Sequence, residues 1–323
     1  MLSDKIESIA LSGTMEISAK LFELRNSGII AYDLCVGEPD LPTPDHIKNA
    51  AKLAIDENKT KYTINSGILE LRKAICTKFL NEYDAHYETN EIIVTNGAKQ
   101  AVYNALQTII SEGDEVLIPS PYYVSYPHMV RLAGGIPRFI ETNMSDSYQI
   151  KTEALKTITN NKTKAIIICN PCNPTGMVYT KDQLQEIVEF AIENNLIILA
   201  DEIYEKLVYD SEAFISLSSL GKEYRENIII VNGVSKAYSM TGWRIGYAVA
   251  SKEIISGMNK VQSHSTSNPC TISQYASLEA ITSDQSLVEK QRAIFEERRH
   301  LVNDMLLESS DIDCVKPKGA FYF

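Results

Sequence analysis

The chain has 323 residues, of which 42 are acidic and 31 basic, so its net charge at pH 7 is −11. A protein this acidic lacks the positive charge that binds a nucleic-acid backbone or an anionic membrane surface, so both classes of partner are excluded at the outset. Hydrophobic residues make up 44% of the chain and charged residues 23%, which is typical of a folded globular protein rather than a disordered one.

The sequence also favours a cytoplasmic location. Its apolar runs have the length of strands, far short of a membrane span. Asp4 and Glu7 lie where a signal peptide needs cations and then an apolar core. Six cysteines spread over this length do not form a disulfide framework.

Short apolar segments alternate with longer amphipathic ones. Blocks rich in Ile, Val and Leu predict strands that are buried on both faces of a sheet. Strand and helix in alternation predict an α/β fold, with a mostly parallel central sheet between two helical layers. The predicted strands are Glu91–Thr95, Glu115–Ile118, Lys164–Cys169, Leu196–Ala200 and Asn227–Val231, and the predicted helices between or before them are Ile68–Tyr83, Ala98–Ser111 and Lys181–Asn194.

The two ends of the chain differ from this centre. A helical pattern at Met15–Asn26 is followed by the stiff, proline-rich run GEPDLPTP (37–44), and Leu287–Glu308 predicts one long charged helix before a strand-like tail. We therefore expect an N-terminal segment (1–44) that contributes to a small α+β domain, a large domain (45–283), and the start of the C-terminal small domain (284–323).

Chemically useful residues follow four of the predicted strands. Gly97, Ala98 and Lys99 open a helix after the first strand, Asn173 follows the third, Asp201 and Tyr204 follow the fourth, and Ser235 and Lys236 follow the fifth. Because ligands of parallel sheets bind at the carboxyl ends of the strands, we expect these residues to converge.

Each of these residues has an ordinary structural explanation when it is taken alone. Gly97 suits a tight turn, Asp201 suits a helix cap, Asn173 suits a proline-rich loop, and Lys236 suits a solvated surface. Together they match the four needs of pyridoxal 5'-phosphate: a lysine for its aldehyde, a carboxylate for its ring nitrogen, donors for its ring oxygen, and a helix N-terminus for its phosphate.

Seven segments carry a resemblance to a known family. In this order and spacing they resemble the class I/II, fold-type I pyridoxal-phosphate aminotransferases, and most of all the bacterial aspartate and aspartate/prephenate aminotransferases. The segments are GEPDLPTP (37–44), KYTINSGILELR (61–72), TNGAKQA (95–101), PSPYYVSYP (119–127), NPCNPTG (170–176), ADEIYE (200–205) and SKAYSMTGWRIGY (235–247).

The resemblance implies roles around the cofactor ring. Lys236 is expected to form the Schiff base and to carry the proton during catalysis. Asp201 is expected to hold the ring nitrogen protonated, Tyr204 and Asn173 to bond the ring oxygen, and Tyr123 to stack on the ring. Lys236, Asp201 and Tyr204 are thus the predicted catalytic residues.

It also implies residues for the phosphate and the substrate. The phosphate is expected against the backbone of Gly97 and Ala98 with Arg244 beside it, and Lys99 and Ser235 are weaker candidates. Substrate contacts are predicted for Gly37, Tyr123 and Asn173. In the family, the residue at Tyr62 reaches the neighbouring subunit, which implies a homodimer with shared active sites.

The implied reaction is transfer of an amino group between an amino acid, with aspartate favoured, and 2-oxoglutarate. Aromatic, alanine or methionine donors are alternatives, as are a C–S β-lyase on the same constellation and a non-catalytic cofactor-binding module. Relatives that bind dicarboxylates have a lysine near an N-terminal Ser-x-Thr segment, and Ala10 stands at that position here.

Two further features complete the sequence-based expectations. Cys169 and Cys172 have half of a zinc-site spacing with no second pair, so we interpret them as structural and expect no metal. The run from Lys318 to Phe323 resembles the beginning of a small-domain strand that continues in the family and leads to the arginine for the substrate α-carboxylate. We therefore expect a truncated aminotransferase that binds the cofactor through Lys236 and transaminates poorly.

Overall fold

The computed structural model describes residues 2–10, 13–34 and 36–323. Its centre is a seven-stranded sheet with the strand order β1-β7-β6-β5-β4-β2-β3. The strands are β1 (Ile92–Thr95), β2 (Glu115–Ser120), β3 (Ile136–Glu141), β4 (Thr163–Cys169), β5 (Ile197–Asp201), β6 (Ile228–Gly233) and β7 (Gly246–Val249). Only β7 runs against its neighbours, β1 and β6, so the predicted mostly parallel α/β sheet is confirmed.

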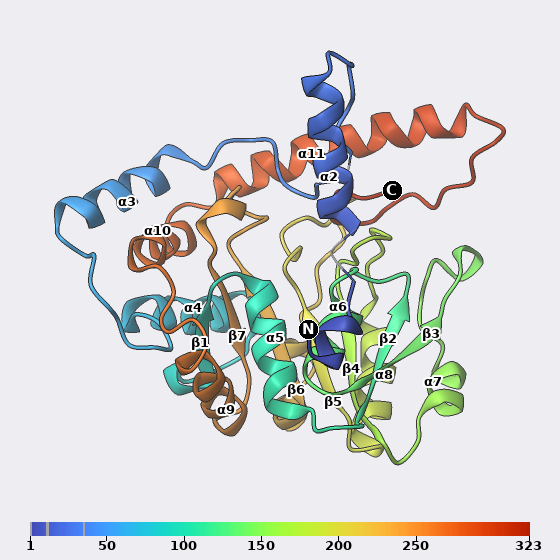
Figure 1. Ribbon diagram of the computed structural model, residues 1–323, viewed down its shortest axis with the longest axis horizontal. Coiled ribbons are helices and arrows are strands. Elements are labelled where there is room, and N and C mark those ends of the chain that lie inside the picture. The colour runs from blue at the N-terminus through green and yellow to red at the C-terminus, as the bar shows by residue number, and fades with distance from the viewer. Residues whose placement is uncertain (1, 11–12, 35) are drawn as a thin grey trace.

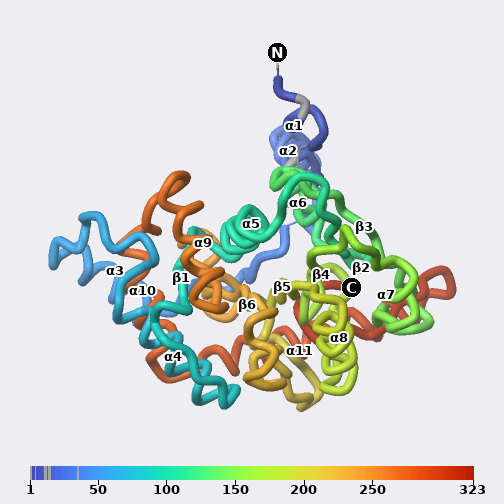
Figure 2. The backbone as a smooth tube through the Cα atoms, turned by 90° about the horizontal axis from the view of Figure 1, so that it is seen from below, coloured from blue at the N-terminus to red at the C-terminus, as the bar shows by residue number. Residues whose placement is uncertain are grey.

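The helices cover both faces of this sheet and also extend beyond it (Figure 1). Around the sheet lie α3 (Asp45–Asp56), α4 (Leu69–Tyr83), α5 (Ala98–Ile109), α6 (Tyr126–Leu132), α7 (Thr152–Ile158), α8 (Lys181–Glu193), α9 (Lys252–Ser263) and α10 (Thr271–Thr282). At the chain ends are α1 (Asp4–Glu7), α2 (Gly13–Asn26) and α11 (Ser286–Leu307). Helix α2 projects away from the sheet in both Figure 1 and Figure 2.

Alternate residues of the strands belong to two separate cores. In β5, Ile198 and Ala200 pack with α4, α8 and α10, whereas Leu199 on the opposite face packs with α5, α6 and α9. Both faces are therefore apolar, because each is covered by helices. The continuous apolar blocks of the sequence have this physical origin.

A third apolar cluster lies apart from the sheet. Tyr204 and Leu207, in the loop after β5, pack there with Phe295 of α11 and with Ala320 near the end of the chain. The cluster fixes α11 against the loop that follows β5. Through Tyr204, this contact reaches the edge of the sheet where the candidate site lies.

Helix α8 shows how local sequence sets an element boundary. The hydroxyl of Thr180 accepts a hydrogen bond from the Gln183 amide at 3.4 Å, and the Gln183 side chain accepts one from the Thr180 amide at 2.9 Å. This reciprocal pair satisfies two amides that would otherwise lack partners at the helix start. The helix accordingly begins at Lys181, as the sequence predicts.

The expected strand-like tail is wrong. Between the end of α11 and Phe323 the described chain makes a single isolated antiparallel bridge, from Gly319 to Val208. Ala320, Phe321 and Tyr322 of this tail instead pack in the third cluster, where Phe321 lies against Tyr204 with ring centroids 5.5 Å apart. Over the described residues, no helix is long and apolar enough to cross a membrane.

Candidate active site

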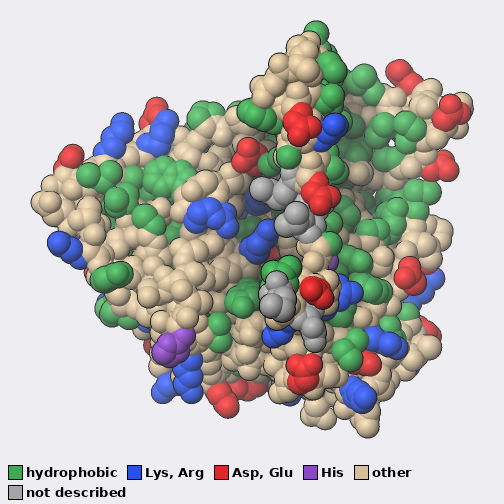
Figure 3. Space-filling view, in the orientation of Figure 1, with side chains coloured by type: hydrophobic (Ala, Val, Ile, Leu, Met, Phe, Trp, Pro, Cys, Tyr) green, Lys and Arg blue, Asp and Glu red, His purple; other side chains and the backbone are tan. Residues whose placement is uncertain are grey.

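A cavity of about 590 Å³ lies at the carboxyl ends of the parallel strands. It brings together the predicted residues that follow β1, β4, β5 and β6. The predicted residues lining it are Gly37, Ala98, Lys99, Tyr123, Asn173, Asp201, Tyr204, Ser235, Lys236 and Arg244. In the orientation of Figure 3, acidic and basic side chains are interspersed over the surface drawn, with no extended basic patch on that face.

Lys236 carries an amine held inside this cavity. Its Nζ donates a hydrogen bond to the carbonyl of Gly37 and lies 5.7 Å from the ring centroid of Tyr204. Burial lowers the pKa of Lys236 to about 8; Glu38 opposes this shift and the positive charge of Arg244 adds to it. The neutral, nucleophilic form is therefore a minority near pH 7, but far more populated than in an ordinary lysine.

Asp201, the last residue of β5, is buried and bound by two donors. Tyr126 of α6 donates its hydroxyl to Oδ2 at 2.7 Å, and the amide of Ile203 donates to Oδ1 at 3.3 Å. Burial raises the pKa of Asp201, while these two hydrogen bonds and the charge of Lys236 lower it. Among the described residues this carboxylate has no ion-pair partner, so the site suits a ligand that presents a cationic group to it.

Tyr204 and Asn173 converge on one phenolic oxygen. The hydroxyl of Tyr204 lies 2.5 Å from that of Tyr322, and Nδ2 of Asn173 donates to the same Tyr322 oxygen at 3.3 Å. The pair fits the cofactor, because Asn173 and Tyr204 already surround one aromatic hydroxyl oxygen, that of Tyr322, inside the cavity. They could hold the ring oxygen of a pyridoxal in the same way.

The N-terminus of α5 has the features that an anion requires. No acceptor binds the amides of Ala98 and Lys99 among the residues that the structure describes, and the helix has no side-chain cap. Gly97 has φ +87°, and a Cβ there would lie 2.2 Å from Nη2 of Arg244. The guanidinium therefore packs directly over the helix start, where a phosphate finds both amides and charge.

Close backbone packing keeps this phosphate cradle in place. A Cβ at Gly246, the first residue of β7, would lie 2.2 Å from the amide nitrogen of Ala98. Arg244 also donates to the Thr241 carbonyl at 2.8 Å and to the Asn96 carbonyl at 3.3 Å. The glycine lets the strand approach the helix start, and the two carbonyls orient the guanidinium.

The aromatic wall of the cavity is Tyr123. Its ring meets that of Tyr126 edge to face, with centroids 5.4 Å apart, and the ammonium of Lys99 lies 5.4 Å from its centroid. Lys99 has no acidic partner within the described part of the chain. The cavity thus contains a cation that is free to meet an anionic ligand.

Two predicted residues lie outside the cavity lining. Gly97 directly precedes the lining residue Ala98 in the sequence. Tyr62 is 91% exposed and does not line the cavity of its own chain. Ala10 is also exposed and away from the lining. The neighbouring Leu11 and Ser12 of the N-terminal segment lie outside the described residues.

Sequence reasoning missed Tyr126 and Tyr322. Tyr126 lies inside the quoted segment PSPYYVSYP, but its contact with Asp201 spans 75 residues and depends on how α6 packs against β5. Tyr322 lies in the tail that was expected to be a strand. The only signal for either residue is a tyrosine near a recognised motif, which does not identify a partner.

Comparison with known proteins places this geometry in a family. The model of the family described as aminotransferase class I and II matches residues 29–323. The aspartate aminotransferase of Bacillus sp. (strain YM-2) is 46% identical over 322 residues, which span 100% of this chain and 82% of that protein. The probable aspartate/prephenate aminotransferase of Rickettsia bellii is 42% identical, over 100% of this chain and 81% of that protein.

Solved structures agree with this result. The structure of aspartate aminotransferase from Thermus thermophilus with maleate matches with a TM-score of 0.95 at 41% identity, over 99% of this chain and 83% of that one. The family and fold predicted from the sequence are confirmed.

Proposed function

The chain belongs to the class I and II aminotransferases, and on this premise we propose that it uses the cavity residues described above to transfer an amino group between aspartate and 2-oxoglutarate. The family is pyridoxal-phosphate-dependent, so the chain is a pyridoxal-phosphate-dependent aminotransferase. The proposal concerns the residue roles and the substrate pair. The observation that carries it is the partly buried Lys236 amine in one cavity with the Asp201 carboxylate.

Each residue has a separate task in this proposal. When bound, pyridoxal phosphate supplies an aldehyde that a primary amine attacks and a ring that accepts the electrons of the bond broken at the substrate α-carbon. Lys236 provides the amine and afterwards moves the proton at the substrate α-carbon. Asp201, supported by Tyr126, keeps a proton on the ring nitrogen. Tyr204 and Asn173 bind the ring oxygen, and Tyr123 packs against the ring.

The phosphate and the substrate engage the remaining residues. The amides of Ala98 and Lys99, Arg244 and, more weakly, Ser235 bind the phosphate, with Gly97 permitting the approach of Arg244. The backbone of Gly37 contacts the α-carboxylate of the substrate. Two findings support aspartate: the relatives are named for it, and the ammonium of Lys99 is available for a second carboxylate.

The assembly and location are further parts of the proposal. We propose a homodimer in the cytoplasm, in which the exposed Tyr62 contacts the neighbouring subunit's phosphate site. We also propose the division into segments 1–44, 45–283 and 284–323, with the cluster of Tyr204, Leu207, Phe295 and Ala320 as the contact between the last two. Light scattering tests the dimer, and limited proteolysis tests the boundaries.

The central experiment tests Lys236. Lys236→Ala protein incubated with pyridoxal phosphate and borohydride should gain no covalent cofactor mass, whereas Lys99→Ala should gain it at a single site. If Lys236→Ala still carries the adduct, the assignment is wrong. Initial rates with aspartate, aromatic, alanine and methionine donors and 2-oxoglutarate then rank the substrates, and pyruvate release from cysteine conjugates would identify a C–S lyase instead.

A further inference from the structure

Two cysteines lie at the end of β4, directly beside the proposed cofactor site. Cys169 is the last residue of β4 and pairs in register with Asp201 of β5. Cys172 follows in the loop, and both cysteines line a small cavity of about 20 Å³ together with Tyr126 and Asn173. Cys169 lines the 590 Å³ cavity as well, so the two cavities share a wall. A small molecule in the larger cavity can therefore contact Cys169 directly, and Cys172 lies on the other side of the shared wall.

The loop holds the two thiols facing one region. Sγ of Cys169 donates to the Pro171 carbonyl at 3.4 Å and accepts a hydrogen bond from the Asn173 amide at 3.4 Å. The backbone of Cys172 is fixed by bonds of 2.9 Å to Met177 and 2.9 Å to Gly176. Both cysteines are free thiols. Their separation of three residues within one closed turn is that of redox-active dithiols.

The two thiols differ in acidity because their surroundings shift their pKa values in opposite directions. Contact with the neighbouring Cys169 side chain, helped by hydrogen bonds from Thr175, lowers the pKa of Cys172 to about 7, against the effect of burial. The same contact, with burial, raises the pKa of Cys169. At pH 7, about half of Cys172 is thus a thiolate, beside the protonated Cys169 thiol. A reactive thiolate next to a second thiol is the arrangement that forms a disulfide most readily.

The sequence alone favoured a structural role for this pair, and the structure supplies the missing observations. Within the described ranges, the one group of three or more possible metal ligands is Asp210, Glu296 and His300, which does not include either cysteine. A partly buried pair of thiols, one of them poised as a thiolate, suits oxidation better than metal binding.

We propose that Cys169 and Cys172 form an oxidant-sensitive dithiol site in which a hydroperoxide produces a disulfide that weakens cofactor binding. The Cys172 thiolate attacks the peroxide, taking one oxygen to become a sulfenic acid as the O–O bond breaks and an alcohol or water leaves. The Cys169 thiol then attacks that sulfur, the S–O bond breaks, and water leaves with the thiol proton. In total two thiols lose two electrons and two protons, and one peroxide is reduced.

The effect on the cofactor rests on the proposed function, whereas the disulfide itself does not. Cys172 directly precedes Asn173, whose amide binds the Cys169 sulfur and whose side chain faces the proposed ring oxygen. Drawing the two sulfurs together removes the Cys169 donor to Pro171 and shifts the position of Asn173. Cytoplasmic thiols would reduce the bond again, so the modification is reversible.

The experiment treats the purified enzyme with hydrogen peroxide, blocks the remaining thiols and maps cross-linked peptides by mass spectrometry. The exposed Cys270 serves as an internal measure of oxidant exposure. A Cys169–Cys172 link should form at peroxide concentrations that leave Cys270 largely unmodified, and saturating pyridoxal phosphate should slow it. Cofactor Kd should rise about tenfold, the effect of one misplaced hydrogen-bond donor, and dithiothreitol should restore it.

Cys172→Ser should lose both the link and the peroxide response of Kd, while the matched Cys270→Ser keeps both. If the map shows oxidised Cys270 and no Cys169–Cys172 link, the dithiol site is refuted, and this readout needs no variant to fold. If the link forms while Kd stays constant, the coupling to the cofactor is refuted. Failure of the Lys236 adduct experiment would instead refute the proposed function and leave the disulfide map unaffected.

Discussion

The hydroxyl of Tyr126 donates a 2.7 Å hydrogen bond to Oδ2 of Asp201, which joins helix α6 to the end of strand β5. Both side chains are buried, and the ring of Tyr126 also supports Tyr123 on the cavity wall. One tyrosine therefore stabilises the carboxylate proposed for the ring nitrogen and positions the aromatic proposed to pack on the ring.

Tyr126→Phe should weaken cofactor binding while the fold stays intact. Loss of a hydrogen bond to a buried charged group costs about 1.5–3 kcal/mol, which corresponds to roughly a tenfold or greater rise in Kd. Spectroscopic titration of cofactor-free protein measures this. Tyr122→Phe is the control, since Tyr122 lines the same cavity and packs on Phe139 at 4.9 Å without bonding Asp201. Equal affinity of Tyr126→Phe and the native protein would contradict the prediction.

Gly97→Ala should damage the phosphate cradle. A Cβ at φ +87° is strained, and it would also displace the Arg244 guanidinium at 2.2 Å. We expect a loss of stability of about 1–3 kcal/mol from the strain and, separately, a weaker preference for pyridoxal phosphate over pyridoxal. Gly113→Ala is the matched control, because Gly113 has φ +86° with open space around it. Gly113→Ala should lose stability to a similar extent as Gly97→Ala, but it should keep the preference for pyridoxal phosphate over pyridoxal.

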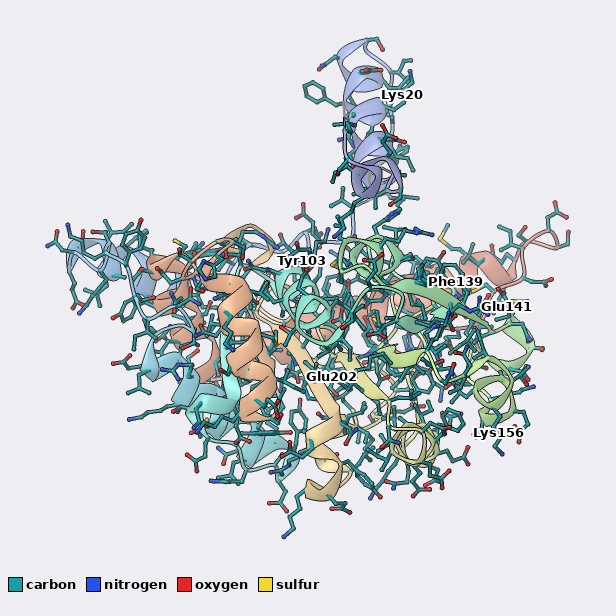
Figure 4. All side chains as sticks on the ribbon, turned by 60° about the horizontal axis from the view of Figure 1, so that its bottom comes forward. Lys20, Tyr103, Phe139, Glu141, Lys156 and Glu202 are labelled. Carbon is teal, nitrogen blue, oxygen red and sulfur yellow. The ribbon has the colours of Figure 1, made fainter. Side chains whose placement is uncertain are left out.

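Glu202→Gln should flatten the pH dependence of stability. Glu202 lies inside the molecule (Figure 4), bound by the Ser216 hydroxyl at 2.7 Å and the Leu217 amide at 2.9 Å. Burial raises the pKa of Glu202 to about 8 from 4.5. Between these values the unfolded chain has lost the proton that the folded chain keeps, so this residue makes stability fall as the pH rises from 4.5 through 8.

Glutamine has no such proton to lose. The difference in unfolding free energy between Glu202→Gln and the native protein should therefore grow in favour of the variant from pH 5 to pH 8, in urea denaturation at equal cofactor concentration. Parallel curves across this range would count against the assignment of this titration to Glu202.

Lys236 should become reactive at a lower pH than an ordinary lysine. Burial lowers its pKa to about 8, so the protonated amine dominates below that pH and the neutral amine above it. In cofactor-free protein, acylation of Lys236 measured by mass spectrometry should rise with a midpoint near pH 8. In denatured protein the same residue should follow its reference pKa of 10.5. A native midpoint close to the denatured one would refute the effect of burial.

The sequence was most informative where chemistry and burial coincide. The apolar blocks of β4 and β5 predicted strands within one residue at each end, because burial on both faces excludes polar alternation. Asp201, Asn173 and Lys236 then followed from their places at strand ends. These features were predictable because local periodicity identifies a buried strand and the chain direction identifies the residues at its carboxyl end.

The missed features depend on tertiary packing. Strand β3 alternates exposed positions with less exposed ones and has a proline second, and β7 begins with glycine, so neither resembles the apolar blocks. The Tyr126–Asp201 bond requires α6 and β5 to pack together, and no local pattern specifies that distance. The tail was expected to be a strand because it resembles a family motif that begins one, yet the rings of Phe321 and Tyr322 pack on Tyr204 instead.

The position of the Tyr322 hydroxyl makes cofactor loading a competition. Asn173 and Tyr204 both bond an oxygen that belongs to the chain itself. If pyridoxal places its ring oxygen there as proposed, it must displace this phenol, and its affinity would be reduced by the stability of the internal contacts. Removing that single oxygen, as in Tyr322→Phe, should free Asn173 and Tyr204 and tighten the binding of pyridoxal phosphate. The native Tyr322 would thus compete with the cofactor for its own site.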